Sequence, residues 1–181
     1  DEYVADCSDI DDIITFTQNG QMRITKVDAK VFIGKNIIHV AIFKKKDKRT
    51  VYNMVYKAGK GAPSYIKRFT ITGITRDKVY PLAGDKPGAQ VLYFSANPNG
   101  EAETITILLR QSGSLKKLKW DMNFAEVLIK GRASKGNLVT KHPIKRIELK
   151  EKGVSTLKPR KIWFDTTVNR INVEERGELL G

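Results

Sequence analysis

The chain has 181 residues, of which 40% are hydrophobic and 29% charged, and its formal net charge is +13. No apolar run approaches the roughly 20 residues that span a bilayer, and no signal peptide is visible, so we expect a cytoplasmic protein without a membrane partner. Cys7 is the only cysteine, which excludes an intrachain disulfide and a cysteine-based zinc site.

Positive charge is concentrated in the middle of the chain. Residues 1–22 hold six acids and no base, whereas residues 23–173 hold 32 bases and 11 acids. Such an excess indicates nucleic acid or another anionic surface as partner. The alternative is that lysines simply solvate exposed strands and loops. We divide the chain into an acidic N-terminal linker, 1–12, and one domain, 13–181. Because it begins at Asp1 rather than Met, we expect it to be part of a longer protein.

Strand signals dominate the sequence, since Thr, Ile, Val, Tyr and Phe occur in short runs between Gly, Asn, Asp and Pro. Asn19-Gly20 predicts a hairpin turn, because both residues tolerate positive φ, and 97–100 (Asn-Pro-Asn-Gly) predicts another tight turn. The segment 121–130 has a weak helical pattern, but an extended or looped conformation fits it better. The predicted strands are 13–17, 21–27, 37–43, 50–57, 64–71, 90–96, 103–110, 114–120, 127–130, 137–141, 145–149, 161–164 and 168–173.

A hairpin-like sequence pattern occurs four times, at 13–27, 55–71, 107–120 and 162–173. Each copy has an apolar strand, a polar turn and a second strand with bases. One basic residue recurs at the same place in each copy, and these anchors are Arg23, Arg68, Lys117 and Arg170. Their spacing of 45 to 53 residues is typical of modular arrays. The fold class is therefore all-β, with sandwich, barrel and propeller as options, and the four repeats favour a propeller-like array. A repeated cation on a repeated β-unit predicts a row of positive charge on the outer rim, suited to a polyanion.

The repeat resembles a known family in the order of its motifs. Thr17-Gln18-Asn19-Gly20 matches a turn, 22–27 matches a basic strand, and 132–139 (Arg-Ala-Ser-Lys-Gly-Asn-Leu-Val) matches a basic loop before an apolar strand. Together they resemble the β-pinwheel in the C-terminal domain of the A subunit of bacterial type IIA topoisomerases, over roughly residues 10–181. The resemblance implies four-stranded blades that exchange strands with their neighbours, here about three blades plus the start of a fourth.

The resemblance also implies a function. Duplex DNA would bend or wrap around the basic outer rim, for ATP-dependent strand passage by a catalytic core elsewhere. The expected partners are double-stranded DNA, the breakage-reunion core of the same chain and the ATPase subunit, near the bacterial nucleoid. The basic box of gyrase is matched only by Arg132, Lys135 and Gly136, in the third unit rather than the first, which favours topoisomerase IV over gyrase. The domain itself would be non-catalytic and need no cofactor or metal.

We predict phosphate contacts by basic residues from every repeat, acting by position and charge. No recognition helix is apparent for reading base edges, so sequence specificity should be low. The candidate DNA-binding residues are Arg23, Lys35, Lys67, Arg68, Lys116, Lys117, Lys119, Arg132, Lys135 and Arg170.

Two other functions remain open. The basic rim of a β-propeller interaction module would also suit an acidic protein partner. A free-standing enzyme would need a cluster of acid and base groups in a pocket, and the sequence offers none.

Overall fold

The computed structural model describes residues 1–28, 30–159 and 161–173. Regular structure there is β apart from one 3-10 turn, Phe124–Glu126, which confirms the all-β prediction. The first sheet has the order β3-β1-β2-β6. Its strands are β3 (Ile37–Phe43), β1 (Asp12–Thr17), β2 (Gln21–Lys26) and β6 (Val79–Pro81).

The β1–β2 turn lies where the sequence predicts it. Gly20 adopts φ +82°, and its amide donates to the carbonyl of Thr17 at 3.0 Å. Asn19 is not among the residues with positive φ, so only Gly20 uses the conformational freedom that the prediction gave to both. The predicted turn at residues 97–100 is also present, with Gly100 at φ +64°.

The second sheet has the order β10-β5-β4-β7, and β11 also pairs with β5. All of its pairs are antiparallel except that of β10 with β5. Its strands are β10 (Ile129–Gly131), β5 (Ser64–Thr70), β4 (Val51–Lys57), β7 (Gln90–Asn97) and β11 (Asn137–Thr140).

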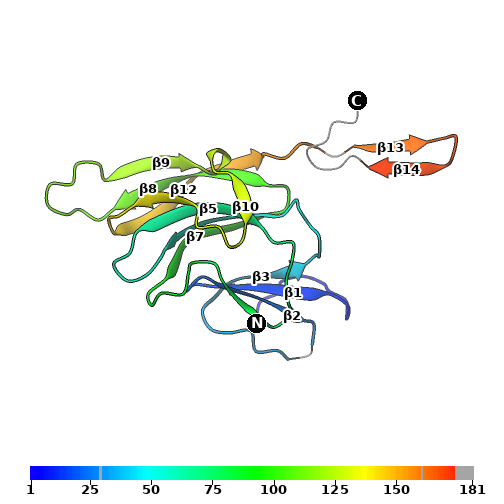
Figure 1. Cartoon of the computed structure of the whole chain (residues 1–181), viewed down its shortest axis with the longest axis horizontal. Coiled ribbons are helices and arrows are strands. Elements are labelled where there is room, and N and C mark those ends of the chain that lie inside the picture. The colour runs from blue at the N-terminus through cyan, green and yellow to red at the C-terminus, as the bar shows by residue number, and fades with distance from the viewer. Residues whose placement is uncertain (29, 160, 174–181) are drawn as a thin grey trace.

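The third sheet has the order β12-β8-β9, and a separate hairpin pairs β13 with β14. Figure 1 shows this hairpin extending away from the three sheets. Large apolar side chains of the hairpin are exposed, Ile162, Phe164 and Ile171 among them. The strands are β12 (Ile144–Ser155), β8 (Glu101–Leu109), β9 (Lys119–Asn123), β13 (Ile162–Asp165) and β14 (Arg170–Val173).

The four predicted repeats correspond to four hairpins, β1–β2, β4–β5, β8–β9 and β13–β14. In each of the first three, the first strand is flanked by a later strand of its own unit, namely β3, β7 or β12. Short strands cross back to the preceding sheet: β6 pairs with β2, and β10 and β11 pair with β5. This crossing agrees with the strand exchange that the resemblance implies.

The sheets form successive layers (Figure 1), with the second sheet between the first and the third. Alternate residues of β4 therefore face opposite cores. Tyr52, Met54 and Tyr56 pack in the first core with Ile14 and other residues of the first sheet. Val55 packs in the second core with Ile66, Ile105, Ile107 and Phe124. Both faces of the second sheet are thus covered, which decides the environment of its charged residues.

The prediction of four-stranded blades holds for the first sheet alone, because the other sheets have five, three and two strands. No closed propeller is formed by the described residues. The sequence also missed β6, which has only three residues and ends in Pro81, and it placed β9 several residues too early.

Candidate nucleic-acid interface

Lys67 and Arg68 are not on a rim, contrary to the prediction that they face solvent. Their side chains are 1% and 2% exposed. They are neighbours on β5 and point to opposite faces of the second sheet. Because the first sheet covers one face and the third covers the other, both cations are buried. Neither is available to a phosphate on the surface.

The buried ammonium of Lys67 binds the 131–136 loop. Its ammonium donates hydrogen bonds to the carbonyl oxygens of Leu82 at 2.6 Å, Arg132 at 3.0 Å and Ser134 at 3.0 Å. Three acceptors use all three donors of the group. Burial lowers the pKa of Lys67 to about 8. The residue therefore positions the 131–136 loop that carries Arg132 and Lys135.

Arg68 crosslinks the other side of the second sheet. Its Nε donates to Asn53 Oδ1 at 2.9 Å, and Nη2 donates to the carbonyl of Gly100 at 3.1 Å and to Thr156 Oγ1 at 3.2 Å. These partners come from β4, from the turn before β8 and from the segment after β12. Arg68 is thus a structural residue that joins the second sheet to the third.

The 131–136 loop lies against the edge of β5 because one of its residues is a glycine. Gly136 has φ +84°, and a Cβ there would lie 2.2 Å from the carbonyl oxygen of Ile66. Tyr56 fixes the same loop by donating its hydroxyl to the carbonyl of Lys135 at 2.7 Å. The loop is therefore held from within by Lys67, by Tyr56 and by the close approach of Gly136.

The loop brings Arg132 against β6, the short strand that crosses back to the first sheet. The guanidinium carbon lies 4.4 Å from the centroid of the Tyr80 ring, and Nη1 donates to the carbonyl of Gly73 at 2.7 Å. The ammonium of Lys78 lies 5.2 Å from the centroid of the same ring. A hydrogen bond from the amide of Thr75, together with these two cations, lowers the pKa of the Tyr80 phenol. The Tyr80 ring thus contacts two cations, one just before β6 and one just after β10.

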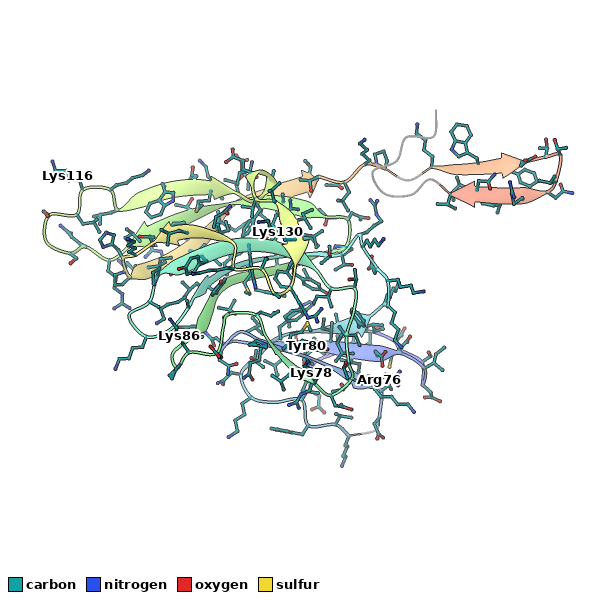
Figure 2. The ribbon with its side chains drawn as sticks, in the orientation of Figure 1. Arg76, Lys78, Tyr80, Lys86, Lys116 and Lys130 are labelled. Atoms are coloured by element: carbon teal, nitrogen blue, oxygen red, sulfur yellow. The ribbon has the colours of Figure 1, made fainter. Side chains whose placement is uncertain are left out.

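Further bases lie on the two chain segments that carry this contact, and together with it they make up what we call the crossing-strand patch. Figure 2 labels Lys130 on β10, Arg76 and Lys78 on the segment that leads into β6, and Tyr80 within β6. Lys135 is exposed, with its ammonium 4.7 Å from the centroid of the Tyr65 ring. The patch consists of Arg76, Lys78, Lys130, Arg132 and Lys135.

Little negative charge opposes the crossing-strand patch. Arg76 forms an ion pair of 2.8 Å with Asp12. Within the described part of the chain, no ion pair to a carboxylate is found for the other four members. Exposed or half-buried cations that lack internal counterions, as these four do, favour an external anion.

The remaining predicted residues lie elsewhere. Lys116, Lys117 and Lys119 are exposed at the β8–β9 connection, whose far end is marked by Lys116 in Figure 2. Arg170 is exposed on the separate β13–β14 hairpin. Arg23 and Lys35 line a cavity on the first sheet. The repeat anchors therefore do not share one environment, and the predicted uniform row of charge is wrong for Arg68.

Sequence reasoning brought together Arg132 and Lys135 but missed Arg76, Lys78 and Lys130. The available signal was that these bases lie beside β6 and β10, which have three residues each. The described residues contain no cluster of three or more His, Cys, Asp or Glu able to hold a metal ion. None of the helical structure described is long and apolar enough to cross a membrane.

The fold and the surface together define a basic all-β repeat domain with strands that cross between neighbouring sheets. The sequence matches the family described as "Topoisomerase C-terminal domain, Bacteroidota" over residues 1–152. The chain belongs to this family.

One curated relative is the A subunit of DNA topoisomerase 4 from Borreliella burgdorferi (strain ATCC 35210 / DSM 4680 / CIP 102532 / B31). It is 24% identical over 150 residues, which cover 82% of this chain and 22% of the relative. The chain thus spans about a fifth of the length of that protein. No solved structure matches the chain.

Proposed function

We propose that this chain is the DNA-binding accessory domain of a type IIA topoisomerase, in its A subunit. It bends or wraps duplex DNA on its basic surface and presents it for ATP-dependent strand passage by the catalytic core. Residues 13–181 form the β-pinwheel-type binding domain, and 1–12 link it to the rest of the protein. The name of the relative favours topoisomerase IV over gyrase, as does the poor match to the gyrase box.

The observation that carries the proposal is the contact of Arg132 and Lys78 with the Tyr80 ring. Two cations held at one aromatic ring, and without a carboxylate partner among the described residues, suit the closely spaced charges of a DNA backbone. Duplex DNA carries a charge about every 1.7 Å along its axis. The crossing-strand patch therefore provides the primary phosphate contacts, and Lys116, Lys117, Lys119 and Arg170 extend the surface.

The chemistry of the patch indicates recognition of the backbone and not of base edges. No α-helix is present in the described residues to enter a major groove. Selectivity then comes from the shape and deformability of the DNA. The partners in the whole protein are the breakage-reunion core and the ATPase subunit, in the bacterial cytoplasm, and the domain itself performs no catalysis.

The test is fluorescence anisotropy with two labelled duplexes of unrelated sequence over a range of salt concentrations. Each neutralised phosphate contributes about −0.9 to the slope of log affinity against log salt, so five cations predict a slope of about −4.5. We expect similar affinities for the two duplexes. A slope near zero would contradict the phosphate contacts. Strong binding of polyglutamate with no DNA binding would instead indicate an acidic protein partner.

A further inference from the structure

The outer face of the first sheet has buried polar atoms without partners. Arg23 Nε and Thr25 Oγ1, both on β2, are buried and have no hydrogen-bond partner in the described structure. They are two residues apart on a strand and therefore share a face. The opposite face carries Met22 and Ile24, which fill the first core. Because a buried polar group without a partner is costly, this pair requires an explanation.

A cavity of about 320 Å³ lies on the same face and has Arg23, but not Thr25, in its wall. That size falls within the roughly 300–1,000 Å³ of small-molecule sites. The second cation of the wall is Lys35, contributed by the 33–36 segment. The amide side chains in the wall are Asn19, Gln21 and Asn36.

The cavity offers donors and no carboxylate. No Asp or Glu is among its lining residues. Thr17 donates its hydroxyl to Asn19 Oδ1, which leaves the Asn19 amide nitrogen available as a donor. Asp12, the acidic residue of β1, points to the opposite face of the sheet from Arg23 and forms an ion pair with Arg76. A wall of two cations and several amides with no negative charge is suited to an oxyanion.

We infer that this cavity binds a phosphate group, with the Arg23 guanidinium and the Lys35 ammonium as its charged ligands. The guanidinium presents donors in a planar fork that matches two phosphate oxygens, and the ammonium adds a mobile point charge. A bound phosphate would accept from Arg23 Nε and satisfy that buried donor. The inference depends on the proposed function only for the source of the phosphate, which is either a DNA backbone or a free phosphate.

The experiment follows the backbone amide resonances of the full chain by NMR while inorganic phosphate is added. We expect saturable shifts confined to Arg23, Lys35 and their neighbours in the cavity wall. Arg23→Gln and Lys35→Gln should each weaken phosphate binding at least tenfold. Lys26→Gln is the matched control, because it removes one exposed cation from the same β2 strand without lining the cavity. Lys35 is exposed, so its variant reports on binding even if Arg23→Gln perturbs folding.

A short duplex, added in place of phosphate, identifies the source. If it produces the same shifts and phosphate competes with it, the site binds the DNA backbone. If Arg23→Gln keeps its DNA affinity but loses phosphate binding, the site serves a free phosphate. Absence of saturable shifts in the cavity with either ligand would overturn the inference. The proposed function would stand in that case if resonances of the crossing-strand patch still responded to DNA.

Discussion

Arg68 Nε donates a hydrogen bond of 2.9 Å to Asn53 Oδ1 between adjacent strands of the second sheet. Both side chains are buried. Asn53 in turn donates to Glu103 on β8, and Tyr93 donates its hydroxyl to the same carboxylate. A buried cation and a buried carboxylate are thus joined through one amide, which ties the second sheet to the third.

Asn53→Ala should destabilise the protein by about 3 kcal/mol, because it leaves Arg68 and Glu103 buried with one partner fewer each. Urea unfolding measures the change. Arg146→Ala is the control, since it breaks a 2.6 Å ion pair with Glu148 in which both side chains are exposed. That change should cost less than about 1 kcal/mol. Equal losses would show that the amide does not couple the two charges.

Lys67 should make stability depend on alkaline pH. Its pKa falls from 10.5 to about 8 on burial in the folded protein. Between these values the unfolded chain binds more protons, so the free energy of unfolding increases as pH rises. The gain from this site amounts to roughly 3 kcal/mol by pH 10.5. Urea unfolding between pH 7.5 and 10.5 measures it.

The variant to compare is Lys67→Met, which removes the pH-dependent stability due to Lys67 and leaves the other titrating groups in place. The stability of the wild type should therefore increase relative to that of the variant over the same pH range. Lys130→Met controls for the loss of an exposed lysine and should run parallel to the wild type. If Lys67→Met also runs parallel, the ammonium does not titrate in this window.

Gly136→Ala should be among the most damaging single-methyl changes in the loop. The new Cβ would meet the Ile66 carbonyl at 2.2 Å, at φ +84°, and we expect a loss of about 2–4 kcal/mol. Gly84→Ala is matched in φ, at +82°, but has nothing within 4 Å, so it should cost only about 1 kcal/mol. Thermal unfolding separates the two. Similar losses would mean that backbone conformation, and not the close contact, makes Gly136 necessary.

Sequence reasoning placed the hairpins well because alternation and turn residues are local properties. Gly20 and Gly100 mark turns that the structure contains. The sequence also identified the family through the order of its repeats, and the family match over residues 1–152 confirms it.

The burial of Lys67 and Arg68 was not predictable from β5 alone. It results from two other sheets that cover both faces of that strand, and those sheets are formed by residues distant in sequence. The role of Lys78 was hidden for the same reason, because β6 has only three residues, ends in Pro81 and finds its place only by pairing with β2. Nonlocal pairing therefore decides which cations reach the surface.

The most direct measurement compares the salt dependence of DNA binding in two double variants. Lys78→Gln with Arg132→Gln removes both cations at the Tyr80 ring, whereas Arg146→Gln with Lys150→Gln removes two cations already paired with carboxylates. The first variant should lower the magnitude of the log–log slope by about 2, and the second should leave it nearly unchanged. Equal effects of the two variants, or an unchanged slope in the first, would contradict a DNA-binding surface centred on the crossing-strand patch.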